Sequence, residues 1–530
     1  MDEPTPPSPS AAQPTLRTSR LHFYAFVGIF IVNFVVYAPS FFHIFRNDQW
    51  TFAYVTRHWG IGSLHKFCDL SQLIWFDRTR FTPLGYMLGG IQQCLFGPWY
   101  PGYHVFSFAL HLGVTWCLCK IMLVMHRGVL AYAVALLFSL LVGNIDGTTW
   151  FAATPYVFQL LLMLVAFYHL ERCVSAGEFP ARRMLWVAGA LGVSVFVNEI
   201  GSVISVLICL FYVLHSRRLR SRTDARWVVL LLLPVALFAG AYCLYSQRVQ
   251  AASGTQEPGS PDRVLTAHNL WQLPDRHRQV FLRYLSLPFV PTTTRLRYAE
   301  VVYVSPGRSS FSPYAVAANG ACVLILVAGL CWSARWVVDK SALAKDARAV
   351  KGRRMLLYLL AALGYMTPIL LGRGVTWGLD IILQTSRYMY GYTAFLFLFL
   401  YAMIDVVELK RIRRGAVHVA FVVSILVLAS MHGLYVSRAI SHITSLLAPL
   451  RSYFDQVHQF VRNHRSEQDF SFRMLTPPPK ISFSDYVHVE KCLPAFFDRY
   501  LREKDPKYTL KFDEEEGKLL VVGARGAPPP

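Results

Sequence analysis

The feature that most constrains the fold is a series of long apolar runs, separated by connections rich in arginine. One of these runs, residues 227–245, contains no charged residue. Over the whole chain 54% of residues are hydrophobic and 16% are charged, whereas soluble domains carry about 25% charged residues. This composition excludes a soluble enzyme and a disordered chain, and it predicts an all-α polytopic membrane protein.

The apolar runs predict about eleven transmembrane helices. The chain has 52 Lys and Arg against 31 Asp and Glu, a net charge of +21. In a membrane protein this excess is typical of loops retained in the cytoplasm and does not indicate nucleic-acid binding. Alternation of the basic loops predicts a cytoplasmic N-terminus and a periplasmic or lumenal C-terminus. We expect spans at 21–45, 102–125, 129–143, 151–170, 184–214 (two short helices meeting at 198–201), 227–245, 313–332, 355–371, 388–403 and 416–435.

The pattern divides the chain into three parts. Residues 1–20, rich in Pro, Ser and Thr, predict a disordered cytoplasmic tail. A transmembrane domain at 21–435 has long external loops at about 46–101 and 246–312, and the first loop is expected to carry interfacial helices. Residues 436–530 predict an external tail or small α/β appendage with strands at 508–512 and 518–522. Arginine outnumbers lysine, which favours a bacterial protein and hence the inner membrane.

Charged residues at the membrane edge are the candidates for a functional site, because an unpaired charge there costs several kcal/mol. Asp48 follows the first span within the segment 46–50. A partly shielded carboxylate is typical either of a general base that deprotonates a hydroxyl or amine, or of a helix-end residue paired with Arg46. Both interpretations remain open from the residues alone.

A second group lies in the segment 76–86, where Asp77, Arg78 and Arg80 precede a proline. The two arginines either bind a phosphate or lipid headgroup or face water. Pro83 is expected to begin a new element, and 84–96 is too short to span the membrane, so it is predicted to lie along the interface.

His104 and His111 form a third group, seven residues apart on one face of the second span. Two isolated histidines on a helix are more typical of hydrogen-bonded packing residues than of metal ligands. A divalent metal held by Asp48 and His104 is the alternative, although no ligand spacing typical of a metal site accompanies it.

Glu199 and Arg387 complete the candidates, at the corner after the fifth span and at the outer start of the tenth. The guanidinium of Arg387 can hold two phosphate oxygens at once, as an anionic lipid carrier requires, or it pairs with Glu199 or Asp380. Tyr390 follows on the same helix. Under the predicted topology all four groups face the same external side of the membrane.

The order of these motifs resembles the GT-C superfamily of membrane glycosyltransferases, in particular protein O-mannosyltransferase-like and aminoarabinose-transferase-like proteins. The resemblance covers roughly residues 20–430 through short motifs in a shared order. Thr82 stands where those families commonly have a second Pro or an Arg, and a single carboxylate replaces their usual acidic pair. The matching segments are Asp48, 80–86, 95–97, 103–111, 197–201 and 386–390.

The resemblance implies transfer of a sugar from a polyprenyl-phosphate carrier to a glycan, lipid or protein acceptor. It implies that Asp48 is the base, that Arg387 binds the donor phosphate with Arg78 and Arg80 nearby, and that Glu199 helps to shape the pocket. His104, Tyr390 and Asp77 are the remaining expected pocket residues. A polysaccharide polymerase or ligase and a flippase for a lipid-linked sugar are the alternative functions; a flippase predicts charges at mid-membrane and repeat symmetry between halves.

Overall fold

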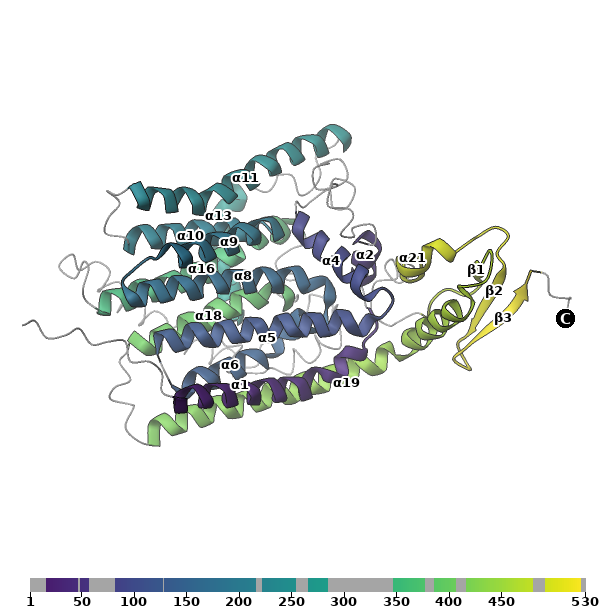
Figure 1. The fold of residues 1–530 in the computed structure, drawn as a ribbon, viewed down its shortest axis with the longest axis horizontal. Coiled ribbons are helices and arrows are strands. Elements are labelled where there is room, and N and C mark those ends of the chain that lie inside the picture. The colour runs from purple at the N-terminus through teal and green to yellow at the C-terminus, as the bar shows by residue number, and fades with distance from the viewer. Residues whose placement is uncertain are drawn as a thin grey trace, which may run out of the picture.

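The computed structural model is a bundle of long helices that continues, at one end, into a small three-stranded sheet (Figure 1). We call the end that faces the sheet the sheet end. The structure describes residues 16–45, 48–56, 82–126, 128–215, 222–253, 266–284, 347–376, 386–406, 416–479 and 491–525.

The long helices run back and forth between the sheet end and the opposite end (Figure 1). They correspond to every predicted span except 313–332, which lies outside the described residues. The helices are α1 (Leu16–Tyr37), α5 (Tyr100–Met125), α6 (Val129–Ser139), α8 (Thr154–Ala176), α9 (Ala181–Val197), α10 (Ile200–His215), α11 (Arg222–Ser253), α16 (Ala347–Thr376), α18 (Ser386–Val406) and α19 (Ala416–His464).

Six helices of the described part are long and apolar enough to cross a membrane, and a seventh span follows if one bent pair is counted as a unit. The bent pair joins α6 to the segment Val142–Thr149 at 59°. Two shorter apolar helices, Ile200–Val213 and Met389–Ile404, lie among them. The chain is therefore an integral membrane protein built mainly of helices, whereas the count of eleven spans stays a prediction.

Several boundaries differ from the predicted ones. Helix α1 begins at Leu16, inside the predicted tail, and ends at Tyr37. The 3-10 helix η1 (Ala38–Phe42) follows, with Pro39 in its first turn. The polar segment between the predicted spans 129–143 and 151–170, which composition predicts as a turn, is helical and buried, as η3 (Val142–Asn144) and α7 (Ile145–Thr149). Helices α5 and α18 cover it.

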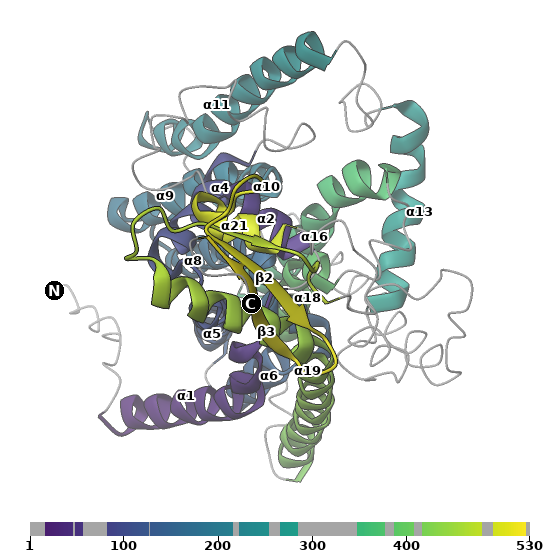
Figure 2. The same cartoon turned by 90° about the vertical axis from the view of Figure 1, so that its right-hand side faces the viewer.

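Part of the predicted external loop 246–312 is helical. Helix α11 continues to Ser253, and the amphipathic α13 (Ala267–Tyr284) packs beside α16. Figure 2, seen from the sheet end, shows α13 at the side of the bundle next to α16. Arg276 of α13 donates to the carbonyl of Leu370 at 3.1 Å, which fastens the loop helix to α16.

A buried ion pair fastens α8 to α16 at the end opposite the sheet. Arg354 Nε lies 2.7 Å from Glu171 Oε2, and the two side chains are 7% and 1% exposed. Tyr358 donates to the other oxygen of Glu171 at 2.7 Å. Glu171 was expected in a cytoplasmic connection; the structure buries it, because a paired and hydrogen-bonded carboxylate is tolerated inside a helix bundle.

Helix α19 connects the bundle to the sheet as one element of 49 residues (Figure 1). The predicted span 416–435 forms its first part, and the predicted appendage begins within the same helix. At about 1.5 Å per residue, the part beyond residue 435 extends roughly 40 Å further, more than the thickness of the hydrocarbon core. The sheet is therefore carried on an extension of a membrane helix.

The sheet comprises β1 (Phe472–Met474), β2 (Tyr508–Asp513) and β3 (Lys518–Ala524) in the order β1-β2-β3. Strands β1 and β2 are parallel, and β2 and β3 form an antiparallel hairpin. The predicted strands 508–512 and 518–522 are thus confirmed. Gln456 of α19 joins the helix to β3, accepting from the Leu519 amide at 2.7 Å and donating to the Gly517 carbonyl at 2.6 Å.

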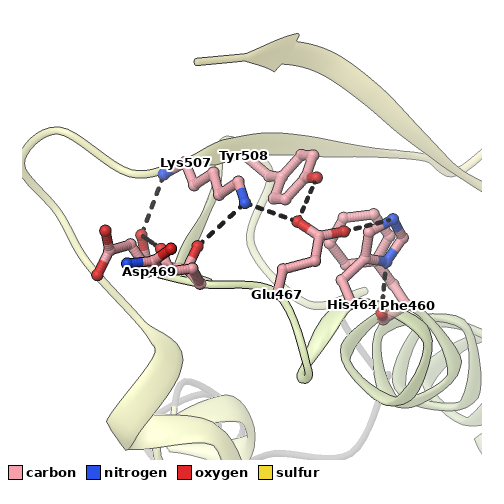
Figure 3. Close-up of polar contacts among 8 residues, drawn as sticks. Phe460, His464, Glu467, Asp469, Lys507 and Tyr508 are labelled. Carbon is pink, nitrogen blue, oxygen red and sulfur yellow. Dashed lines mark hydrogen bonds and ion pairs between the residues drawn. The ribbon is translucent and has the colours of Figure 1, made fainter. Parts of the chain in front are cut away.

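Figure 3 shows how the end of α19 is tied to the start of β2. Lys507 Nζ lies 2.8 Å from Glu467 Oε2, and the Tyr508 hydroxyl donates to the same oxygen at 2.7 Å. The hydrogen bond from Lys507 is the main cause that lowers the pKa of Glu467 below its ordinary 4.5. The carboxylate in turn raises the pKa of Lys507.

This contact predicts a pH dependence of local stability. A carboxyl group whose pKa is lowered on folding stabilises the fold above its unfolded pKa, and the contribution is lost as the pH falls through the folded value. Protection of the β2 amides against hydrogen exchange, corrected for intrinsic rates, should hold down to about pH 5 and decline below that. Glu467→Gln should remove this decline; the same decline in that variant would contradict the assignment.

Candidate functional site

The short helices and the corner that carry or follow the candidate residues lie at the sheet end of the bundle. Helix α2 (Asp48–Thr56) begins at Asp48, and α4 (Pro83–Phe96) follows the segment that contains Arg78 and Arg80. Figure 1 shows both short helices between the bundle and the sheet. The corner between α9 and α10 carries Glu199 and lies at the same end.

Helices α2 and α4 are in close contact because α4 presents glycine to its neighbour. A Cβ at Gly89 would lie 2.6 Å from the Phe52 ring, so only glycine permits this approach. Phe52 also stacks on Tyr86, with ring centroids 6.2 Å apart. Gln93 donates to the carbonyl of Ala53 at 2.6 Å. The two helices are thereby held side by side, and α4 begins at Pro83 as predicted.

The Glu199 corner packs against the first turn of α4. Gly85 faces the carbonyl of Val197, and the Asn198 side chain accepts from the Ile200 amide at 3.2 Å, which caps α10. Glu199 itself is half-buried and interacts electrostatically with Tyr242 of α11. The prediction that 184–214 forms two helices that meet at this corner is confirmed.

Phe151 connects α2 to the rest of the site. It lies in the 3-10 helix η4 (Phe151–Ala153) and is fully buried. Its ring centroid is 4.8 Å from that of Phe45, 5.3 Å from that of Phe52 and 4.9 Å from that of Tyr103. Aromatic side chains from the segment before α2, from α2 itself and from α5 therefore all pack against Phe151.

His104 holds the chain just before α2. Its Nε2 donates to the carbonyl of His43 at 2.8 Å, and the Nε2 of His43 donates to Thr444 of α19 at 2.8 Å. Both histidines are about 1% exposed. This series of bonds links α5, the segment ahead of Asp48, and α19, so His104 acts as a packing residue.

His111 holds the start of α18 through Tyr390. Its Nε2 lies 3.0 Å from the carbonyl of Ser139, which can only accept, so Nδ1 is the acceptor for the Tyr390 hydroxyl at 2.6 Å. Tyr390 is fully buried and packs against Gly147 of α7. Arg387 is one helical turn nearer the start of α18.

The structure describes only some of the candidate residues. The backbones of Asp48 and Arg387 belong to α2 and α18, but their side chains lie outside the described atoms. Asp77, Arg78 and Arg80 lie outside the described residues altogether. Among described residues, no group of three or more His, Cys, Asp or Glu side chains is arranged to hold a metal ion.

Trp50 and its aromatic neighbours belong to the site although the sequence did not single them out. The fully buried Trp50 contacts the nearby Phe45 and also Phe454 and Phe496, which are distant in the sequence. The available signal was the Leu-Pro-Ala-Phe-Phe run at 493–497, an apolar stretch within an otherwise charged segment. Nothing in such a run indicates which partner it packs against.

No protein-family model and no curated protein matches this chain. The structure is similar to that of an Archaeoglobus fulgidus oligosaccharyltransferase in complex with zinc and sulfate, at 13% identity and a TM-score of 0.40, covering 91% of this chain and 67% of that one. It is also similar to ArnT from Cupriavidus metallidurans, covering 94% of both chains at 14% identity, with TM-scores of 0.30 in the apo state and 0.32 bound to undecaprenyl phosphate. Similarity at this level establishes neither a shared fold nor a shared activity.

The contact between α7 and α18 generates a prediction. A Cβ at Gly147 would lie 2.6 Å from the Tyr390 ring. We expect Gly147→Ala to destabilise the protein by about 1–3 kcal/mol through overpacking and to displace the start of α18. Unfolding in detergent measures this effect. Gly189→Ala is the matched control, because nothing lies within 4 Å of its added Cβ; equal stabilities of the two variants would contradict the prediction.

Proposed function

We propose that this chain is a membrane glycosyltransferase of the GT-C type, which transfers a sugar from a polyprenyl-phosphate-linked donor to an acceptor. The reaction takes place at the sheet end, which the charge pattern assigns to the periplasmic or lumenal side. The observation that supports this proposal best is that histidines of α5 bond both to His43, shortly before Asp48, and to Tyr390, one turn after Arg387.

The contacts with α5 support a similar depth in the membrane for Asp48 and Arg387. His104 holds the carbonyl of His43, shortly before Asp48, and His111 holds Tyr390, one turn after Arg387. Two turns of α5, or about 10 Å, separate the two histidines. Since Arg387 lies on the sheet-end side of Tyr390, the two candidate residues are attached at similar depth, which favours a common cavity.

In the proposed reaction, Asp48 accepts the proton of an acceptor hydroxyl or amine as that group attacks the anomeric carbon of the donor. The bond from the anomeric carbon to the phosphate oxygen breaks, and the lipid phosphate leaves with the bonding electrons. Arg387, with Arg78 and Arg80, offsets the charge of the phosphate. Attack opposite the leaving group inverts the configuration at the anomeric carbon.

The other candidate residues have supporting roles in this proposal. Asp77 and Glu199 line the pocket and orient the arginines or the sugar. His104 and Tyr390 position the chain around the reacting groups. The donor needs no nucleotide-binding loop, because the lipid phosphate is itself the leaving group.

Replacing the proposed base tests the reaction. Asp48→Asn keeps the shape of the side chain but removes the proton acceptor, so we expect kcat to fall by a factor of about 10² or more. The thermal midpoint of unfolding should be unchanged. Asp505→Asn removes an exposed carboxylate paired with Arg525 in the sheet region and serves as the control. Wild-type turnover of donor by Asp48→Asn would contradict the assignment of Asp48 as the base.

Replacing the proposed phosphate ligand separates donor binding from proton transfer. Arg387→Ala should weaken binding of the donor about 10- to 100-fold, the loss expected for a charge-assisted hydrogen bond. Arg387→Lys should restore part of this affinity, because lysine keeps the charge but loses the two-pronged geometry. Binding of a polyprenyl phosphate in detergent measures the effect, with exposed Arg172→Ala as the control. Unchanged affinity in Arg387→Ala would remove the phosphate role.

A further inference from the structure

Helix α2 is too short to hold its own position. It has nine residues, and isolated helices shorter than about 12 residues are marginal in water. The residues next to it in the chain, 46–47 and 57–81, lie outside the described part. Within the described part, α2 is contacted by α4, α21 (Cys492–Phe497) and η4.

The central side chain of that packing is Trp50, two residues after Asp48 and fully buried. Its ring centroid lies 5.1 Å from that of Phe45, 5.6 Å from that of Phe454 and 6.2 Å from that of Phe496. We call these four residues the Trp50 cluster. Its members also contact one another, with Phe45 and Phe454 at 5.6 and 5.7 Å from Phe496.

Two of the three rings around Trp50 come from the C-terminal part of the chain. Phe454 belongs to the extension of α19, and Phe496 belongs to α21 (Cys492–Phe497). Figure 2 shows α21 in front of α2 at the sheet end, and the two helices are in contact. The sheet residues Leu510 and Phe512 belong to the same hydrophobic cluster as Trp50 and Ala53.

A shared core distinguishes this arrangement from a separate appendage. An independent domain would bury its own core and meet the bundle through a polar surface. Here Ala53 of α2 and Cys492 of α21 are both fully buried in one cluster. Further contacts join the same parts, including the Tyr100 hydroxyl, which donates to Asp455 at 3.2 Å.

We infer that the C-terminal segment 436–525 serves to position α2, and that Phe496 is a positioning residue for Asp48 through Trp50. The consequence for catalysis rests on the function proposed above; the mechanical role does not. In this proposal Phe496 acts through the orientation of α2.

The test is Phe496→Ala in the full chain, with hydrogen exchange of the α2 amides as the first measurement. We expect exchange at residues 52–56 to increase about tenfold or more, because Trp50 of α2 loses one of the rings that pack against it. In the transfer reaction kcat should fall while the KM for donor stays near its wild-type value. Phe496→Leu, which retains much of the apolar volume, should restore both properties in part.

Phe470→Ala is the matched control. Phe470 is 8% exposed and packs within the sheet region, against Phe460, Phe472 and Tyr500. It should accelerate exchange in β1 and β2 but leave α2 unchanged. Equal acceleration of α2 exchange by both variants would show general loosening of the C-terminal segment and overturn the specific role of Phe496.

The two proposals fail separately in this design. Unchanged α2 exchange in Phe496→Ala overturns the positioning role, even if Asp48→Asn is inactive. Full activity of Asp48→Asn overturns the catalytic assignment, while faster α2 exchange in Phe496→Ala would still establish that the C-terminal segment holds α2.

Discussion

The burial of aromatic side chains between α2, α5 and α19 is the interaction on which the sheet end depends. Phe45 contacts Trp50, Tyr103 and Phe151, so one ring joins the segment before α2 to α5 and to η4. Large aromatic side chains bury much apolar surface while losing little conformational entropy. A short helix can therefore be fixed at the edge of a membrane bundle without a long run of backbone hydrogen bonds.

Histidines complement these rings with directional contacts. His43, His104 and His111 each bond to a backbone carbonyl on another element. In a membrane interior an unsatisfied carbonyl is costly, so a ring N–H that reaches it stabilises one arrangement of the helices. His104 and His111 both make such contacts, as expected for hydrogen-bonded packing residues.

The sequence indicated the helices well, because the length of an apolar run and the charge of the loops beside it are local properties that determine whether a segment spans the membrane. It correctly divided 184–214 at Asn198 and assigned the strands around Leu510 and Leu520. It did not indicate that α19 continues unbroken beyond Tyr435, because the change from apolar to amphipathic composition resembles a helix end. Nor did it reveal the Trp50 cluster, since contacts between residues 45, 50, 454 and 496 leave no periodic pattern in a single sequence. The candidate residues were found as motifs, whereas the positions of α2, α4 and the start of α18 depend on tertiary packing that the motifs do not encode.

We propose that Asp48 and Arg387 line one cavity at the sheet end. An experimental structure of the full chain with a bound polyprenyl phosphate would test this proposal. We expect the phosphate in contact with the Arg387 guanidinium, with the Asp48 carboxylate on the same side of the membrane and facing the same space. A phosphate bound elsewhere, or the two side chains more than about 20 Å apart with protein packed between them, roughly two helix diameters, would contradict it.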